Sequence, residues 1–172
     1  MARTAGGDTT AFETIVRRHQ GPLLRFAAAL AGDRDTAADI VQEAFVALWR
    51  MRDRYRPSGS LKAYLYRLVR NACIDQSRSA WARRVPLDDC APATFDPQVG
   101  VRLADALRAA LGSLPEGQRT VFLLSAQEGL SYQEIADVVG RPLGTVASRK
   151  AAAVDTLRAR LGPWLRGEDD EL

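Results

Sequence analysis

The side chains best suited to chemistry are Tyr64, Arg67, Asn71, Asp75 and Arg78, which follow one another at intervals of three, four, four and three residues. At about 3.6 residues per turn, this spacing places them within an arc of roughly 80° on one helix face. An aromatic ring, two guanidiniums, an amide and a carboxylate on one face can stack on unpaired bases and hydrogen-bond to them. The alternative is a solvated helix face on which Asp75 pairs with a neighbouring arginine.

Neighbouring residues add positive charge and a loop to this stripe. Lys62, Tyr66 and Arg70 fall on a flank of the same expected helix and strengthen the case for nucleic acid. Just before them, the sequence Arg-Pro-Ser-Gly-Ser at residues 56–60 predicts a flexible loop. Its exposed backbone amides could hold a base or a phosphate.

A second pattern, in residues 129–150, is typical of a helix-turn-helix. Ser131 and Glu134 predict a capping box, because a hydroxyl and a carboxylate three residues apart satisfy the free amides at a helix start. Gly140 can end that first helix in a left-handed conformation, and Pro142 suits the start of the next one. Two short helices are therefore expected to meet at a tight corner.

The second of these helices has the character of a DNA-reading helix. An apolar side directed inward leaves Thr145, Ser148 and Arg149 opposite, near the amino end, where base edges are normally contacted. An ordinary helical hairpin with a solvated basic face is the alternative. The inward-facing residues are predicted to be Val146, Ala153, Leu157 and Leu161.

The elements that position these residues are predicted to be helices throughout. Three apolar patterns of helical period precede residue 79, and the first contains a Gly21-Pro22 pair that could bend it. Two more helices, at 101–111 and 118–127, precede the helix-turn-helix. The first three patterns are Phe12, Ile15, Val16, Leu23, Ala27 and Leu30; Ile40, Val41, Ala44, Leu48 and Trp49; and Leu61, Leu65, Leu68, Val69 and Ala72.

Prolines and aspartates in residues 79–100 break every period, so this segment is interpreted as a linker. The predicted fold class is all-α, with two small helical domains joined by a flexible linker and the helix-turn-helix in the second domain. The expected boundaries are 1–85 for the first domain, 86–100 for the linker, 101–166 for the second domain and 167–172 for an acidic tail.

The charge distribution indicates a polyanionic partner for the first half. Among the 172 residues, 1–85 hold 15 Lys and Arg against 8 Asp and Glu, whereas 86–172 hold 9 against 13. A basic surplus of this size fits nucleic acid, although a merely solvated basic surface is the common alternative. No apolar run is long enough for a signal peptide or a membrane span, so a cytoplasmic location without membrane insertion is expected.

Cysteine and histidine usage argues against a metal site or a catalytic centre. Nothing forces Cys73 and Cys90 to pair, and the single histidine, His19, is far from both in the sequence, whereas zinc needs about four ligands at short spacing. No Gly-rich phosphate loop, nucleophile elbow or clustered carboxylate pair is present. We therefore expect no metal, no cofactor, no small-molecule substrate and no enzymatic activity.

Three segments together resemble one protein family. Asp-Ile-Val-Gln-Glu-Ala-Phe-Val-Ala-Leu-Trp at 39–49, Leu-Tyr-Arg-Leu-Val-Arg-Asn-Ala-Cys-Ile-Asp at 65–75 followed by Arg78, and the helix-turn-helix at 129–149 resemble the extracytoplasmic-function (ECF) sigma factors of bacterial RNA polymerase. The resemblance covers nearly the whole chain, in the right order. Each motif alone is modestly specific, and three in series are strongly so.

The resemblance implies a transcription initiation factor that binds core RNA polymerase at the clamp helices of its largest subunit, recognises promoter DNA and melts it, in a stress or envelope-signal response. It also implies a sequestering anti-sigma partner. The polymerase-binding candidates are Asp39, Ile40, Gln42 and Glu43, and the alternative for this segment is helix capping by a Thr36–Asp39 box. The minus-ten candidates are Arg56, Ser58, Lys62, Tyr64, Arg67, Asn71, Asp75 and Arg78; the minus-thirty-five candidates are Arg141, Thr145, Ser148, Arg149 and Lys150.

This chain departs from the family pattern in both DNA-facing helices. Tyr64 stands where members usually carry tryptophan, which alters the ring at the edge of the melted duplex. In the second helix, Ala147 replaces a basic residue, Lys150 an apolar one and Ala152 an arginine. Fewer side chains can therefore reach the groove, although the stem of Lys150 is long enough to carry its charge to a phosphate. The sequence of the upstream element cannot be carried over from the family.

Two other functions stay open at this stage. A self-contained helix-turn-helix regulator would act as a dimer on duplex operators, but no heptad run is visible to support a dimer. An adaptor tethered to polymerase would keep the helix at 39–49 and dispense with specific DNA contacts.

Overall fold

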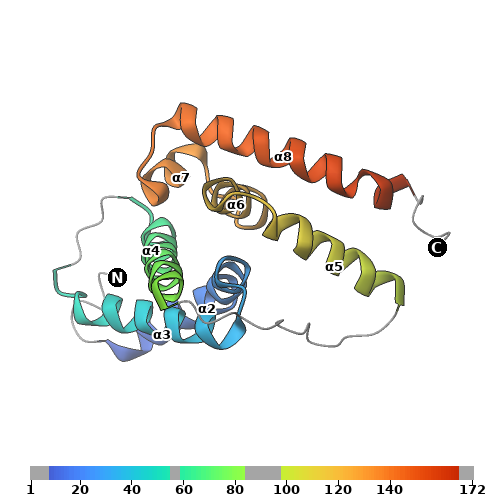
Figure 1. Ribbon diagram of the computed structural model, residues 1–172. Helices are drawn as coiled ribbons and strands as arrows, with labels where there is room; N and C mark the ends of the chain where they lie inside the picture. The colour runs from blue at the N-terminus through green and yellow to red at the C-terminus, as the bar shows by residue number, and fades with distance from the viewer. Residues whose placement is uncertain (1–7, 55–58, 84–97, 167–172) are drawn as a thin grey trace.

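The computed structural model describes residues 8–54, 59–83 and 98–166, and every regular element in these ranges is helical (Figure 1). Within them, the side chains of 78–83, 98–104 and 164–166 are left undescribed. The helices form two lobes, which confirms the predicted all-α fold class. The first lobe comprises α2 (Thr9–Ala31), α3 (Arg34–Arg50) and α4 (Leu61–Arg83); the second comprises α5 (Gln98–Gly112), α6 (Glu116–Phe122), α7 (Tyr132–Val139) and α8 (Leu143–Arg166).

The first lobe is a bundle of three helices around an apolar core. The carboxylate of Asp8 accepts a hydrogen bond from the amide of Ala11 at 3.0 Å and so caps α2. The helix runs on through Pro22 and ends at Gly32, whose φ of 78° suits a residue without a Cβ. Leu23 and Phe26 face inward with no exposed surface and pack among α3 and α4.

The start of α3 corrects one detail of the sequence analysis. The N-cap is Asp33, whose carboxylate accepts a hydrogen bond from the Thr36 amide at 2.7 Å, so the Thr36–Asp39 capping box was wrong. An aspartate three residues earlier in an extended conformation already satisfies the free amides. Hydrogen bonds from Thr36, together with weaker ones from the backbone of Asp35 and Arg34, hold the pKa of Asp33 below its usual range. The charged cap therefore stabilises α3 until the pH falls through that lowered pKa.

The second lobe places α5 and α6 against the long helix α8 (Figure 1). Helix α5 begins at Gln98, inside the predicted linker 86–100, most of which lies outside the described residues. After α6 the chain makes a π-helical turn at Leu123–Gln127, in which the Glu128 amide donates to the carbonyl of Leu123 at 3.2 Å. A π-helical turn inside a helix is rare and often occurs at a functional position.

The helix-turn-helix forms as the local sequence predicts. Ser131 caps α7 and Glu134 reaches back to the Ser131 amide at 3.0 Å, which confirms the capping box. Gly140 ends α7 with a φ of 62° and a ψ of 42°, and α8 starts directly after Pro142. Val146 is completely buried beneath the corner.

Replacing Ser131 by alanine is expected to lower the free energy of unfolding by about 1 kcal/mol, because the Glu134 amide loses the hydroxyl oxygen that accepts its hydrogen bond. Urea unfolding followed by circular dichroism measures this loss. Thr14→Ala is a matched control, because Thr14 is an exposed hydroxyl residue inside α2 and should change the stability by less than about 0.5 kcal/mol. Equal effects of both changes would rule out the cap as the cause.

The two lobes share a continuous apolar core. Helix α4 packs against α7, and one cluster of buried residues extends from Leu23 in α2 through Leu65 and Val69 in α4 to Leu124 and Ile135 in the second lobe. Figure 1 shows α4 between α3 on one side and the helices α6 and α7 on the other. One side of α4 is therefore covered by the second lobe.

Candidate functional site

The polar stripe of α4 lies largely at the surface. Arg67 and Asn71 are exposed and Tyr64 is half-buried. The guanidinium of Arg67 lies over the ring of Tyr64, 5.4 Å from its centroid, and the Tyr64 hydroxyl donates to the sulfur of Met51. The amide oxygen of Asn71 accepts a hydrogen bond from Arg70 at 3.3 Å. An aromatic ring and a guanidinium are thus brought together beside an accessible amide, as base stacking requires.

The remaining minus-ten candidates extend the stripe only in part. Asp75 is exposed on the same helix, four residues beyond Asn71. Arg78 belongs to α4, but its side chain is not among those described. Arg56 and Ser58 lie outside the described residues.

The residues on the flank of α4, Lys62, Tyr66 and Arg70, are less accessible than the sequence predicts. Tyr66 is completely buried, because its ring packs edge-on against Phe26, with centroids 5.1 Å apart, and its hydroxyl donates to the carboxylate of Glu128. Burial and this carboxylate raise the pKa of Tyr66. Lys62 is half-buried and donates to the backbone carbonyl of Glu128. Tyr66 is therefore a core residue between the lobes and presents no surface to a ligand.

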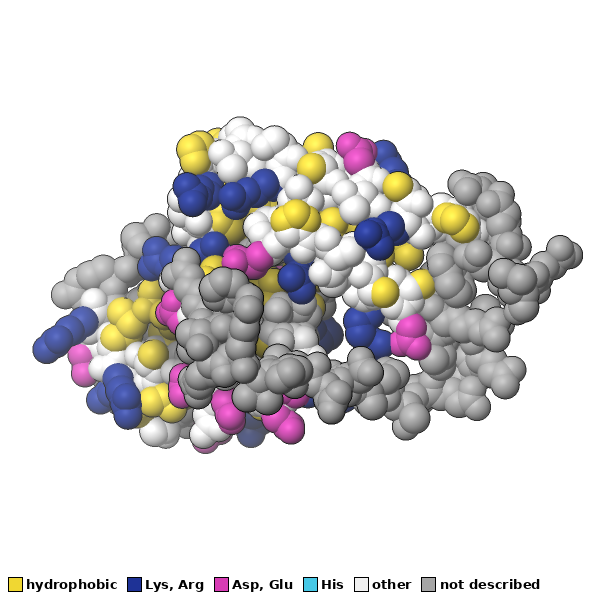
Figure 2. All heavy atoms as spheres, in the orientation of Figure 1, with side chains coloured by type: hydrophobic (Ala, Val, Ile, Leu, Met, Phe, Trp, Pro, Cys, Tyr) yellow, Lys and Arg dark blue, Asp and Glu magenta, His cyan; other side chains and the backbone are white. Residues whose placement is uncertain are grey.

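The polymerase-binding candidates occupy the outer side of α3. Asp39, Gln42 and Glu43 are exposed, whereas Ile40 is only 4% exposed and belongs to the core. The expectation that Ile40 contributes to a binding surface is therefore corrected: its side chain packs inward because it shares the apolar side of α3. In Figure 2, acidic side chains gather along the lower edge of the view, where α3 lies.

An open apolar groove of about 680 Å³ runs between α2 and α3 beside these polar residues. Phe12 lies in it edge-on to Trp49, with ring centroids 4.9 Å apart, and Gln42 forms part of its wall. Val46 is 40% exposed there. Exposed apolar surface bordered by polar side chains is typical of a protein-binding site.

The amino end of α8 presents few charged groups outward. Leu143 is 47% exposed, and Gly144, Ser148 and Ala151 are exposed on the outward side. The Ser148 hydroxyl donates to the carbonyl of Thr145 at 3.1 Å. A helix with small outward side chains can come close to the base edges of a major groove.

Two cationic residues of α8 lie at the sides of this surface. Arg149 is half-buried, and its guanidinium lies so close to Gly117 of α6 that a Cβ there would be 2.9 Å away. The ammonium of Lys150 lies 5.1 Å from the ring centroid of Tyr132 in α7. Arg141, in the corner between the helices, is exposed. Basic side chains gather over α7 and the start of α8 in Figure 2.

Sequence reasoning missed the acidic and aromatic partners of these cations. Glu128 and Glu116 contact Lys62 and Arg70 across the lobes, and Tyr132 lies beside Lys150. The one available signal was Glu128 itself, an isolated charged residue between the apolar residues 121–124 and Leu130. Its spacing alone does not reveal which helix it meets.

Within the described residues, no group of three or more His, Cys, Asp or Glu side chains is arranged to hold a metal ion. His19 is half-buried, and its pKa is lowered by burial and by the nearby charges of Arg18 and Lys62. None of the described helices is long and apolar enough to cross a membrane.

Comparison with known families divides the chain as the two lobes do. Residues 15–83 match Sigma-70 region 2, and residues 104–157 match Sigma-70 region 4. The first match contains α3 and the polar stripe of α4, and the second contains the helix-turn-helix.

Relatives of known structure and sequence extend the likeness to nearly the whole chain. The ECF RNA polymerase sigma factor SigM of Mycobacterium tuberculosis is 34% identical over 166 residues, which cover 96% of this chain and 82% of SigM. CnrH, solved with the cytosolic domain of CnrY, is 30% identical with a TM-score of 0.74 and 94% of each chain covered. The sigma factor RpoE, solved with the anti-sigma factor NepR from Bartonella quintana, is 25% identical with a TM-score of 0.75, covering 88% of this chain and 97% of RpoE. This chain belongs to the ECF family of RNA polymerase sigma factors.

Proposed function

We propose that this protein binds core RNA polymerase, directs it to a set of promoters and opens their DNA strands. The observation that carries the proposal is the pairing of an accessible aromatic and guanidinium stripe on α4 with a helix-turn-helix in the second lobe. One surface suits unpaired bases and the other suits duplex DNA. A promoter being melted offers both at once.

The proposed polymerase surface consists of Asp39, Gln42 and Glu43 on α3. All three are exposed polar residues, and the apolar groove with Val46 lies next to them. A partner can therefore bury apolar area in the groove while its cations meet the two carboxylates. The clamp helices of the largest polymerase subunit are the expected partner.

The proposed strand-opening surface is the α4 stripe of Tyr64, Arg67, Asn71 and Asp75, extended by Lys62, Arg78 and the loop with Arg56 and Ser58. Extruding a base from a duplex costs a few kcal/mol, which stacking and hydrogen bonds in the bound state must offset. The chain itself makes and breaks no covalent bond in this process. Melting follows because the single-stranded form of the minus-ten element is bound more tightly than the duplex.

The proposed upstream contact is the amino end of α8 in the major groove. Ser148 is exposed and Thr145 is half-buried at this end, whereas Arg149, Lys150 and Arg141 flank it and suit phosphates as well as base edges. The minus-thirty-five element would thus be bound mainly through the fit of α8 in the major groove and through contacts of its cations with phosphates.

The biological setting is proposed from the relatives. RpoE was solved with the anti-sigma factor NepR and CnrH with the cytosolic domain of CnrY, so we expect a sequestering protein partner for this chain too. A cytoplasmic location and a role in a stress or envelope-signal response accompany that expectation.

Association with core polymerase followed by run-off transcription tests the proposal against its alternatives. The promoter templates come from mapping transcription start sites after overexpression of the protein. Stable association with promoter-dependent initiation is the expected result. Failure to bind core polymerase would contradict the proposal and favour a free-standing regulator, and association without promoter-dependent initiation would favour an adaptor.

Replacing Arg149 by alanine is expected to weaken binding of the holoenzyme to a fragment with the upstream element by about 1–3 kcal/mol, if the guanidinium makes a base contact. Competition gel shifts measure this change. Arg158→Ala is the matched control, because Arg158 is an exposed arginine of α8 farther from its amino end. Identical affinities of the two variants would show that Arg149 only packs against α6.

A further inference from the structure

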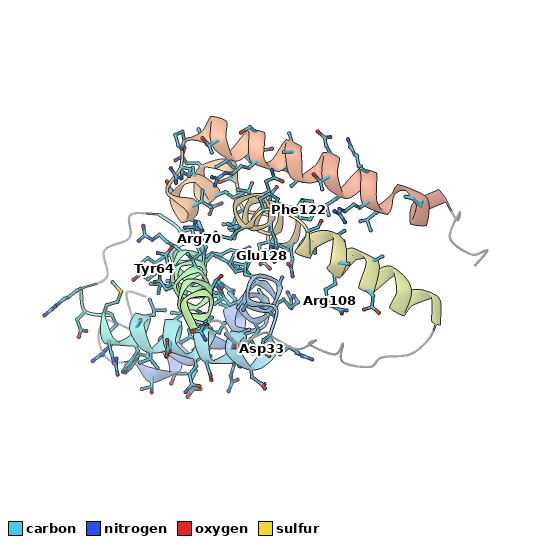
Figure 3. The ribbon with its side chains drawn as sticks, in the orientation of Figure 1. Asp33, Tyr64, Arg70, Arg108, Phe122 and Glu128 are labelled. Atoms are coloured by element: carbon cyan, nitrogen blue, oxygen red, sulfur yellow. The ribbon has the colours of Figure 1, made fainter. Side chains whose placement is uncertain are left out.

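The second helix of the helix-turn-helix begins with an exposed apolar side chain. Leu143, the first residue of α8, is 47% exposed, and no large apolar side chain among the described residues is more exposed. Figure 3 shows the start of α8 at the outer edge of the second lobe, with no described helix above it. An apolar group of this size is therefore accessible to a partner at the end of α8 where base edges are normally contacted.

The residues next to Leu143 leave its side chain uncovered. Gly144 has no side chain, and Ala147, one turn further along the same side of α8, is half-buried and has a single methyl group. Ala151, another four residues on, is exposed and equally short. Leu143 thus extends further from α8 than the two alanines, and it reaches the floor of a groove before they do.

The charged groups of this region lie to the sides and suit the walls of a groove. The guanidinium of Arg149 lies beside Gly117 of α6, and the ammonium of Lys150 lies 5.1 Å from the ring centroid of Tyr132 in α7. Arg141 is exposed in the corner that precedes α8. Contacts of cations with phosphates position a helix on DNA but carry no sequence information, which comes from side chains that reach the base edges.

Thymine alone offers a methyl group in the major groove. Guanine, adenine and cytosine present hydrogen-bond acceptors or donors at their exposed edges. Leu143 has no polar atom in its side chain, so opposite one of these three bases it would remove a polar group from water without forming a hydrogen bond, which is unfavourable. Opposite thymine it buries the methyl group instead, which strengthens binding by about fourfold.

We propose that Leu143 selects thymine at one position of the upstream element by packing against the 5-methyl group of the base. The inference rests on the proposed function, because it requires α8 to lie in the major groove. It gives the alanine-rich start of α8 a means of discriminating between sequences that its neighbouring outward residues, Gly144 and Ala151, do not supply.

Single thymine-to-uracil replacements test the contact, because uracil lacks only the methyl group. Each thymine of the upstream element is replaced in turn, on either strand, and competition gel shifts measure binding of the holoenzyme to the promoter fragment. At one position the replacement should weaken binding of the parent protein about fourfold. Leu143→Ala should bind the thymine and uracil fragments equally at that position. Leu107→Ala is the matched control, because Leu107 is an exposed leucine of α5, and this variant should respond to uracil as the parent does.

A second variant should change the preferred base. Leu143→Gln introduces an amide that can hydrogen-bond to both N6 and N7 of adenine. At the position identified with uracil, this variant should bind adenine about fivefold or more better than thymine, whereas the parent prefers thymine. A Leu143→Gln protein that keeps the parent's preference for thymine would overturn the proposal.

The outcomes separate the thymine contact from the DNA-binding function itself. The contact is overturned, and the function stands, if the parent holoenzyme prefers the upstream element to a scrambled duplex but responds to no uracil. The same holds if Leu143→Ala responds to every uracil as the parent does. No preference of the parent for the upstream element over the scrambled duplex would overturn the role of α8 in promoter recognition, and the thymine contact with it.

Discussion

Holoenzyme carrying Asn71→Ala is expected to bind duplex promoter DNA normally but to form open complexes at least about tenfold less often. Asn71 is exposed on α4, and its amide oxygen accepts one long hydrogen bond, from Arg70 at 3.3 Å. The amide can therefore turn to a flipped base at little cost. Without this amide, a desolvated base loses a hydrogen-bond partner, which costs about 1–3 kcal/mol of binding free energy. The loss affects only the open complex, because the base is extruded only there.

Permanganate reactivity of thymines in the melted region measures this effect, and gel shifts at low temperature measure duplex binding. Ser77→Ala is the matched control, because Ser77 is exposed on the same helix about 120° away from Asn71. Normal permanganate reactivity in Asn71→Ala would remove Asn71 from base capture. A parallel loss of duplex binding would indicate a general defect of α4 instead.

Replacing Phe26 by alanine is expected to lower the free energy of unfolding by about 3–5 kcal/mol. Phe26 has no exposed surface and packs edge-on against Tyr66, with ring planes at 79°. The change leaves a cavity in the first lobe at the base of the cross-lobe contact. Such a loss is a large share of the 5–15 kcal/mol that typically stabilises a protein.

Urea unfolding monitored by circular dichroism and by tryptophan fluorescence measures this loss. Leu107→Ala is the control, because Leu107 is 41% exposed on α5 and should cost less than about 1 kcal/mol. A cost below about 1 kcal/mol for Phe26→Ala would contradict the packing around Tyr66. Because the Tyr66 hydroxyl also donates to Glu128, the Phe26 variant should in addition loosen this contact between the lobes.

The parts of the fold that sequence predicted well are those set by neighbours along the chain. The capping box of Ser131 and Glu134 and the left-handed Gly140 are fixed by residues at most a few positions apart, so the helix-turn-helix was predictable. The start of α3 shows the limit of this approach. Asp33 and Thr36 are both good capping residues, and only the extended backbone at Asp33 decides between them.

The parts that sequence did not predict are contacts between distant residues. Tyr66 and Arg70 share a flank with Lys62 and were interpreted as surface groups. Periodicity identifies which side of a helix is polar, but it does not say that a buried glutamate from residue 128 will cover that side. Ile40 was placed in a binding surface by the family resemblance, although the helical period puts it on the apolar side of α3, and it packs in the core. The roles of Arg67, Asn71 and Arg149 in binding DNA remain predictions.

The position of Glu128 depends on the exact number of residues in the π-helical turn at Leu123–Gln127. Such a turn holds one residue more than an α-helical turn, so everything beyond it is rotated by about 100° around the helix axis. Deleting a single residue from this segment would restore the α-helical register and turn Glu128 away from α4. The number of residues in this turn, whatever their side chains, thus sets the direction in which Glu128 points.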